Sequence, residues 1–242
     1  MVVADRAASP ASVGSPATAI QLADVMRVYR EVDVETIALR GIDLEVARGE
    51  FVALMGRSGS GKSTLLQLLA GSDRPTAGRV IVDGIDLSRA DEDERGRLRG
   101  AHVGIVFQSG NLIPFLDLEE NVQLSAELAG RPIDRVGTRA ILQRVGLAGR
   151  ERHRPSQLSG GEQQRGALAA ILATRPPIVL ADEVTGELDS TSAERLLDLL
   201  VEVHRQDGMT LLMATHDPHV AARADRIIEL RDGRVVADRR IR

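Results

Sequence analysis

The sequence predicts an α/β fold with a mixed β core and an inserted helical sub-domain. Short apolar runs alternate with amphipathic stretches along most of the 242 residues, a pattern typical of α/β proteins. Between residues 109 and 157 the strand signals stop, and apolar residues recur at helical spacing, first at Leu118 and Val122 and then at Ile141 and Val145. With 43% hydrophobic residues, the chain can bury a core large enough for one domain with a sub-domain.

The first residues differ in composition from the rest of the chain. Residues 1–18 are rich in Ala, Ser and Pro and show no apolar period, so we expect a disordered tail. Residues 19–242 are expected to form the domain, with the helical sub-domain at about 109–158.

Apolar runs and helical periods give the expected elements in order. Strands are expected at residues 20–28, 37–45, 50–55, 78–82, 103–107, 178–181, 210–214, 227–230 and 234–237. Helices are expected at residues 62–70, 159–174, 190–207 and 218–224. The charged residues 91–99 are interpreted as a solvated surface segment.

Composition and charge exclude several classes of function. The net charge of -4 argues against a surface devoted to nucleic acid. The lack of cysteine excludes disulfides, thiolate metal sites and a cysteine nucleophile. No apolar run approaches the roughly 20 residues that span a bilayer, and no signal peptide is recognisable, so a membrane role would come through a partner. Lys62 is the only lysine among 31 basic residues, which suggests that its compact ammonium group is needed where it stands.

A glycine-rich loop lies between an apolar run and an apolar helix. It fits the pattern G-x-x-x-x-G-K-[ST] in the strand–loop–helix context that this motif requires. Its backbone N–H groups can converge on a polyphosphate, Lys62 can reach the β- and γ-phosphates, and the hydroxyl of Ser63 can bind Mg²⁺. A Gly/Ser-rich surface turn is the alternative explanation. The loop and the residue after it comprise Gly56, Arg57, Ser58, Gly59, Ser60, Gly61, Lys62, Ser63 and Thr64.

Two carboxylates end the apolar run at residues 178–181. Asp182 is placed to hold Mg²⁺, and Glu183 to polarise an attacking water as the general base. A solvent-exposed strand end is the alternative. His216 follows another apolar strand and is a candidate contact for the γ-phosphate, although a lone histidine there is more often structural. Gln108 ends the strand at 103–107, where its amide could meet Mg²⁺ or the attacking water.

A second glycine-bearing helix start follows residue 158. Its residues are Leu158, Ser159, Gly160, Gly161, Glu162 and Gln163. Such a start suits a second anion, and because the chain has one triphosphate loop, the second site can serve a neighbouring molecule.

Over residues 20–238 these motifs resemble the ATP-binding cassette family of phosphate-loop NTPases. The resemblance implies that residues 56–63 are the Walker A loop, Gln108 the Q-loop glutamine and Asp182 the end of Walker B. It also implies that Glu183 is the catalytic base, His216 the switch histidine and Ser159 part of the signature sequence.

The resemblance also implies cofactors and partners. ATP and Mg²⁺ are expected as cofactors, and two copies are expected to sandwich two ATP molecules. Residues Ser159, Gly160, Gly161 and Glu162 of one copy would then meet the ATP of the other. Tyr29 falls at the family's adenine-stacking aromatic, although an ordinary core or surface tyrosine is the alternative.

The chain departs from the family pattern in two places. Arg57 stands where proline is common in the loop, and its side chain is expected to point away harmlessly. Val184 stands where proline often follows the catalytic glutamate, so we expect a looser backbone there.

Three stretches narrow the resemblance to the lipoprotein-release, macrolide-export and cell-division branch. They are residues 107–122, 185–190 and 224–226. The branch implies an ATPase that drives an integral membrane permease of few spans, for export or mechanotransmission, at the cytoplasmic face of the membrane. The alternatives are a soluble cassette ATPase acting on DNA or ribosomes, and a regulatory nucleotide-binding module without turnover. No nucleic acid partner is expected.

Overall fold

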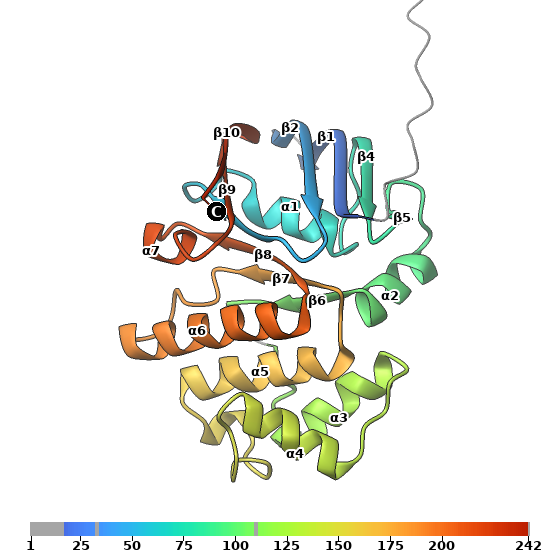
Figure 1. The fold of residues 1–242 in the computed structure, drawn as a ribbon. Coiled ribbons are helices and arrows are strands. Elements are labelled where there is room, and N and C mark those ends of the chain that lie inside the picture. The colour runs from blue at the N-terminus through green and yellow to red at the C-terminus, as the bar shows by residue number, and fades with distance from the viewer. Residues whose placement is uncertain (1–16, 32–33, 109–110, 242) are drawn as a thin grey trace, which may run out of the picture.

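Two β-sheets lie on either side of helix α1 (Lys62–Leu69) in this computed structural model, which describes residues 17–31, 34–108 and 111–241 (Figure 1). The antiparallel sheet has the order β2-β1-β4-β5. Its strands are β1 (Thr18–Glu31), β2 (Val34–Ala47), β4 (Ala77–Val82) and β5 (Ile85–Asp86).

The second sheet has the order β10-β9-β3-β8-β7-β6. Its strands are β3 (Phe51–Met55), β6 (Val103–Val106), β7 (Ile178–Asp182), β8 (Thr210–Thr215), β9 (Arg226–Arg231) and β10 (Arg234–Arg240). All its pairs are parallel except β9–β10. The carboxyl ends of five strands therefore lie along one edge, where ligands of open α/β sheets usually bind.

The six-stranded sheet is covered on both faces, which explains its continuous apolar runs. In β3, Val52 and Leu54 belong to the cluster that contains α1 and the antiparallel sheet. Phe51 and Ala53, which point the other way, belong to the cluster that contains the helices of the opposite face.

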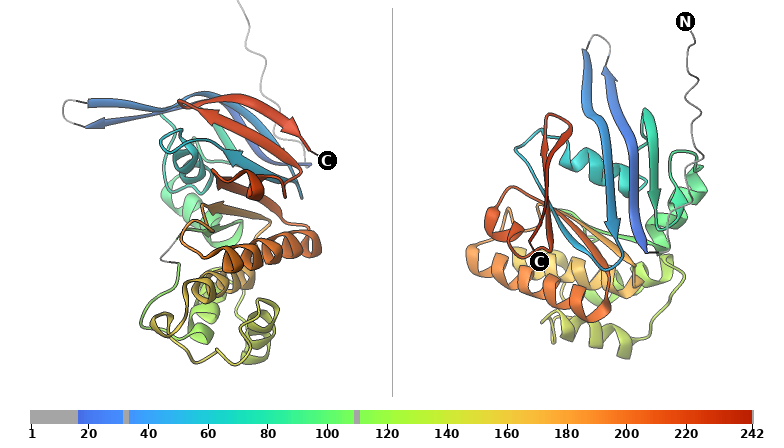
Figure 2. Two further views of the ribbon diagram at one scale, coloured as in Figure 1. Left: turned by 90° about the vertical axis from the view of Figure 1, so that its left-hand side faces the viewer. Right: turned by 45° about the horizontal axis from the view of Figure 1, so that its top comes forward.

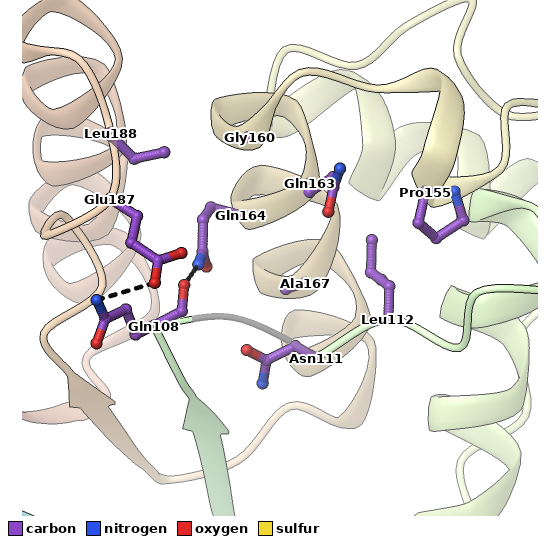
Figure 3. A pocket seen from close by; sticks show the side chains of 10 residues that line it. All are labelled: Gln108, Asn111, Leu112, Pro155, Gly160, Gln163, Gln164, Ala167, Glu187 and Leu188. Atoms are coloured by element: carbon purple, nitrogen blue, oxygen red, sulfur yellow. Dashed lines mark hydrogen bonds between the residues drawn. The ribbon is translucent and has the colours of Figure 1, made fainter.

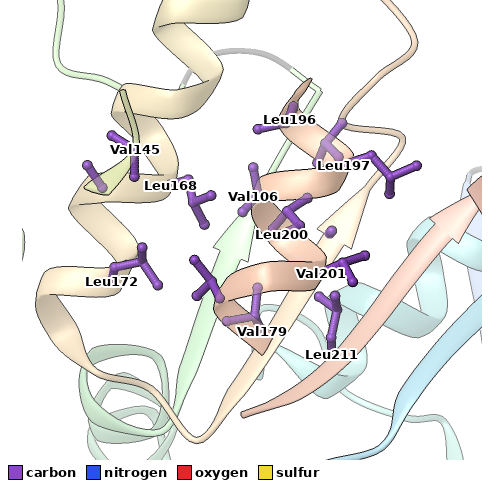
Figure 4. Close-up of a cluster of buried hydrophobic side chains, with 14 of the residues drawn as sticks. Val106, Val145, Leu168, Leu172, Val179, Leu196, Leu197, Leu200, Val201 and Leu211 are labelled. Carbon is purple, nitrogen blue, oxygen red and sulfur yellow. The ribbon is translucent and has the colours of Figure 1, made fainter. Parts of the chain in front are cut away.

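Helices α5 (Gly160–Thr174) and α6 (Ser190–Asp207) cover that opposite face. Leu168 of α5, Leu196 and Leu200 of α6 and Val179 of β7 meet in one buried cluster, as Figure 4 shows. Both helices are thereby fixed to the strands that carry the candidate site.

The segment after β6 is helical, and its described residues contain no strand. Helices α3 (Leu118–Leu128) and α4 (Arg135–Arg144) and the short 3-10 turn η1 (Pro155–Gln157) lie beyond α5, on its side away from the sheet (Figure 2). Leu118, Val122 and Leu142 join the buried cluster of α5.

The structure corrects several predicted elements. The charged segment interpreted as solvated is exposed at residues 91–94, but it also forms helix α2 (Glu92–Ala101), which was not predicted. A capping box between Asp91 and Glu94 starts this helix, and Arg95 and Leu98 are buried in it. The predicted tail reached residue 18, but Thr18 pairs with Ala47 in β1, and residues 1–16 lie outside the described residues. Helix α7 (Pro218–Ala221) ends three residues earlier than predicted.

Within the described part of the chain, no helix is long and apolar enough to cross a membrane.

Candidate nucleotide-binding site

The loop between β3 and α1 requires glycine at two positions. Gly61 has φ 106°, and a Cβ there would lie 2.7 Å from the carbonyl oxygen of Ala38. A Cβ on Gly56 would lie 2.5 Å from the carbonyl oxygen of Leu230. Side chains would therefore push the loop away from the surfaces on which it rests.

Lys62 begins α1 and folds back over this loop. Its Nζ donates hydrogen bonds to the carbonyl oxygens of Gly56 (2.8 Å) and Arg57 (3.3 Å), and the residue is only 5% exposed. Gly61 caps the helix without a side chain, so the first N–H groups of α1 remain available to an anion. Arg57 is exposed, as expected for a side chain that points away.

Glu183, which follows β7, contacts both Lys62 of the phosphate loop and His216 after β8. Its Oε1 lies 3.4 Å from Nζ of Lys62, and its Oε2 lies 3.4 Å from Nδ1 of His216. Strands β3, β8 and β7 are adjacent and parallel, so the segments that follow them meet at one edge. The structure thus brings together three of the residues predicted from sequence.

The backbone at Glu183 is firmly held. Glu183 has φ 47°, and its N–H donates to the carbonyl oxygen of Ala214 (3.1 Å), while its own carbonyl accepts from Gly186 (2.9 Å). Val184 is 2% exposed and packs in the cluster under α6. Valine is thus a core residue at this position, and the looser backbone expected there stays a prediction.

Asp182 has the surroundings of a metal ligand. Burial raises the pKa of Asp182 above its ordinary value, the charge of Glu183 adds to the rise, and the hydrogen bond from Ser63 and the charge of Lys62 oppose it. Its Oδ1 is buried without a hydrogen-bond partner. A hard cation between Asp182 and Ser63 would satisfy that oxygen.

No group of three His, Asp or Glu residues suited to a metal occurs in the described residues. A cation at Asp182 and Ser63 would therefore take most of its oxygens from phosphates and water, which is how Mg²⁺ binds with nucleotides.

Tyr29 is held on β1 beside the same region. Its hydroxyl donates to Asp73 (2.9 Å), and the guanidinium carbon of Arg27 lies 4.3 Å from the centre of its ring. Tyr29 and Arg27 line a cavity of about 440 Å³ that Ser63 and Asp182 also line. One ring face is thus occupied by a cation, a contact that the sequence did not predict.

Gln108 follows β6 and does not line the cavity of Ser63 and Asp182. It lines a second pocket, between α5 and the segment after β7, and its Nε2 donates to Oε1 of Glu187 (3.1 Å; Figure 3). Ser63 and Asp182 line a different pocket, so the metal role of Gln108 stays a prediction. Sequence reasoning missed Glu187 as the partner of Gln108, although Glu187 lies within the stretch 185–190 that narrowed the resemblance.

The predicted signature residues cap helix α5. Ser159 accepts from the N–H of Glu162, whose carboxylate in turn accepts from the N–H (2.9 Å) and hydroxyl (2.9 Å) of Ser159. The hydrogen bond from the Ser159 backbone lowers the pKa of Glu162. Gly161 is buried against α6, where a Cβ would lie 3.0 Å from that of Ser192, while Gly160 is exposed.

Within one chain the two glycine-bearing helix starts are separate. Gly160 lines the pocket of Gln108, whereas residues 56–60 line a different one with the turn of β9 and β10. The signature residues therefore do not meet the phosphate loop of their own chain.

This fold and this site define a phosphate-loop nucleotide-binding protein with an acidic group poised beside the loop lysine. The sequence profile of the ABC transporter family matches residues 39–186. The chain therefore belongs to the ABC transporter family, and the resemblance stated from the sequence is confirmed.

Curated relatives lie in the expected branch. The chain is 48% identical over 222 residues to the lipoprotein-releasing system ATP-binding protein LolD of Anaeromyxobacter dehalogenans, covering 90% of this chain and 93% of the relative. It is 46% identical over 221 residues to the macrolide export ATP-binding/permease protein MacB of Hyphomonas neptunium, covering 90% of this chain but only 34% of that relative. An uncharacterized ABC transporter ATP-binding protein of Mycobacterium tuberculosis is 46% identical over 219 residues, covering 90% of this chain and 88% of the relative.

A solved structure of an ATP-binding cassette has the same fold. The cassette MJ0796, a dimer in a post-hydrolysis state bound to ADP and Pi, superposes with a TM-score of 0.86 at 40% identity, covering 92% of this chain and 99% of that one. The α/β cassette fold with mixed sheets is confirmed, and the chain is an ATP-binding and ATP-hydrolysing subunit of this family.

Proposed function

We propose that two copies of this chain sandwich two ATP molecules and drive an integral membrane permease of few spans. In this homodimer each ATP lies between residues 56–64 of one copy and residues Ser159, Gly160, Gly161 and Glu162 of the other. The separation of these two sites within the monomer supports this arrangement. The dimer of the related cassette MJ0796 supports it too.

The contact between Lys62 and Glu183 carries the proposed catalytic mechanism. Lys62 binds the β- and γ-phosphates, and Glu183 takes a proton from the water that attacks the γ-phosphorus as the bond to ADP breaks. His216, which shares the Glu183 carboxylate, contacts the γ-phosphate. Tyr29 stacks on adenine.

We assign the metal site to Ser63 and Asp182, with Gln108 as a further ligand or water-orienting group. The orphaned Oδ1 of Asp182 supports the assignment. When bound, Mg²⁺ would neutralise charge on the β- and γ-phosphates.

The names of two relatives support the proposed partner and location. One is named as part of a lipoprotein-releasing system, and another is named as a combined ATP-binding and permease protein for macrolide export. We infer a peripheral location at the cytoplasmic face of the cell membrane, through the permease, for export or mechanotransmission. Residues 109–158 form the helical sub-domain in this proposal.

Glu183→Gln tests the mechanism. The amide keeps the shape of the side chain but accepts no proton, so ATP hydrolysis should fall about 10²- to 10⁴-fold while ATP binding persists. Size-exclusion chromatography with ATP should then show a nucleotide-bound dimer. Glu127→Gln, an exposed change on α3, is the matched control. Failure of Glu183→Gln to accumulate a dimer would contradict the sandwich.

A further inference from the structure

Tyr29 lies on an arm of the β1–β2 hairpin that no third strand of the described chain joins. Strand β4 pairs with β1 from Ile20 to Met26, and beyond Met26 the described pairs of β1 are with β2 alone. The hairpin extends past the other strands of its sheet (Figure 2). Because a two-stranded ribbon is only marginally stable in water, the ring of Tyr29 needs contacts outside the sheet to keep one position.

Asp73, in the segment after α1, supplies such a contact. Its Oδ2 accepts from the hydroxyl of Tyr29 (2.9 Å) and from Nε of Arg27 (2.7 Å). The N–H of Asp73 donates to the carbonyl oxygen of Gln67 in α1 (3.2 Å), so the carboxylate is anchored to that helix. Helix α1 begins at Lys62, and it therefore links the phosphate loop to the support of the Tyr29 ring.

Arg27 covers one face of the same ring. Its guanidinium carbon lies 4.3 Å from the centre of the Tyr29 ring, which is a cation–π contact. The side chains of Arg27 and Asp73 are only 22% and 20% exposed, so their ion pair is partly shielded from water. An aromatic ring has two faces, and a planar base can stack only on the one that Arg27 leaves uncovered.

We propose that Arg27 and Asp73 are positioning residues that hold the Tyr29 ring in the orientation in which its uncovered face receives adenine. The inference rests on the proposed function, in which Tyr29 stacks on adenine. A ring that is already held loses little side-chain freedom when the base arrives, and this saving favours affinity. Because Arg27 and Asp73 act through Tyr29, their effect on binding should depend on the base and not on the phosphates.

Affinity for ligands with and without a base tests the proposal. Isothermal titration would compare adenylyl imidodiphosphate with inorganic triphosphate, both with Mg²⁺. Arg27→Ala and Asp73→Ala should each weaken binding of the adenine nucleotide about two- to tenfold, the range for ordering one side chain on binding. Binding of triphosphate should not change, which also shows that the phosphate loop of each variant is folded.

The charges of the two residues provide an internal control. Arg27→Ala removes a positive charge and Asp73→Ala a negative one, so a purely electrostatic effect on an anionic ligand would have opposite signs in the two variants. Arg27→Lys keeps a cation that can reach the ring and should return affinity toward the wild type. Arg30→Ala removes a neighbouring arginine that is 79% exposed and pairs with Glu35, and it should change neither affinity.

The ring itself can be observed directly. Tyr29 is the only tyrosine, and the sequence has no tryptophan, so tyrosine emission reports on this side chain alone. In protein measured without nucleotide, Arg27→Ala should lower the anisotropy of this emission, because the ring gains freedom. In a Tyr29→Ala background, the effect of Arg27→Ala on nucleotide affinity should vanish.

Unchanged or tighter binding of the adenine nucleotide by Arg27→Ala would overturn the proposal, since the guanidinium would then be idle or would occupy the face that the base needs. An effect of Arg27→Ala that persists without Tyr29 would overturn it as well. The variant Tyr29→Ala separates these outcomes from failure of the proposed function. If Tyr29→Ala weakens binding of triphosphate as much as that of the nucleotide, the proposed stacking of Tyr29 on adenine is itself wrong.

Discussion

Nζ of Lys62 lies 3.4 Å from Oε1 of Glu183, so the cation of the phosphate loop and the carboxylate proposed as general base form an ion pair. The ammonium group also donates to two loop carbonyls, of Gly56 and Arg57. An incoming γ-phosphate must compete with Glu183 for Lys62. Phosphate binding would therefore release the carboxylate to act on water, which links occupancy of the loop to activation of the base.

Lys62→Arg should weaken ATP binding about 10- to 100-fold although it keeps the charge. Lys62 is 5% exposed, and the planar guanidinium cannot occupy the volume or hydrogen-bond directions of the compact ammonium group. Isothermal titration with MgATP measures the loss, and circular dichroism checks folding. Affinity close to that of the wild type would show that the site needs only a positive charge.

Asp182→Asn should stabilise the chain measured without nucleotide and should strongly reduce its stabilisation by magnesium. Burial raises the pKa of Asp182, so between its unfolded and folded pKa values the folded chain holds more protons than the unfolded chain. Stability therefore falls as pH rises through that window, and the charge remains destabilising above it. Asparagine removes this pH dependence.

Thermal denaturation across pH measures both effects of Asp182→Asn. MgATP at 100 times its Kd should raise the free energy of unfolding of the wild type by about 2.7 kcal/mol. Omitting Mg²⁺ should lower this stabilisation much less in the variant than in the wild type. If the variant gains as much stability from Mg²⁺ as the wild type, Asp182 does not hold the metal.

Two inactive variants should restore activity when mixed. Lys62→Met disables the loop half of the site, and Ser159→Arg blocks the signature half. In a mixed dimer both defects fall in one of the two shared sites, and the other site stays intact. With random pairing about half of the dimers are mixed, and each of these has one working site of two. An equal mixture should therefore regain about a quarter of wild-type ATPase activity. No recovery, with dimers present, would contradict a site shared between copies.

Tyr29→Ala should lose roughly tenfold in ATP affinity, and Tyr29→Phe should lose much less. Stacking of a base on an aromatic ring depends on the ring, whereas the hydroxyl serves the bond to Asp73 (2.9 Å). Titration with ATP and with inorganic triphosphate separates the contributions. If Tyr29→Ala weakens triphosphate binding equally, Tyr29 does not contact the base.

The parts of the fold with strong apolar signals were predictable. Helix α6 was predicted at its observed bounds, Ser190–Asp207, because its amphipathic period is long and Gly208 ends it in a left-handed conformation. Helix α2 was missed because Arg95 and Leu98 are its only buried residues, although the pair Asp91 and Glu94 could have indicated its start.

The strands predicted for β1 and β2 were shorter than the observed ones for a different reason. The hairpin continues to Glu31 and Val34 through backbone pairing, for example between Tyr29 and Thr36, and pairing beyond the apolar part leaves no hydrophobic period to read.

In the site, motif spacing placed Lys62 and Glu183 correctly relative to parallel strands. Motif spacing did not predict individual hydrogen bonds between side chains far apart in sequence. The bonds of Gln108 to Glu187 and of Tyr29 to Asp73 depend on how loops from different layers meet, which local pattern does not encode.

The solitary lysine has a practical consequence for work on this protein. Lys62 carries the only ε-amine in the sequence, and its side chain is almost fully covered. Amine-directed dyes should therefore react slowly with Lys62 while the loop is closed. Labelling of Lys62 would therefore report directly that the loop had opened.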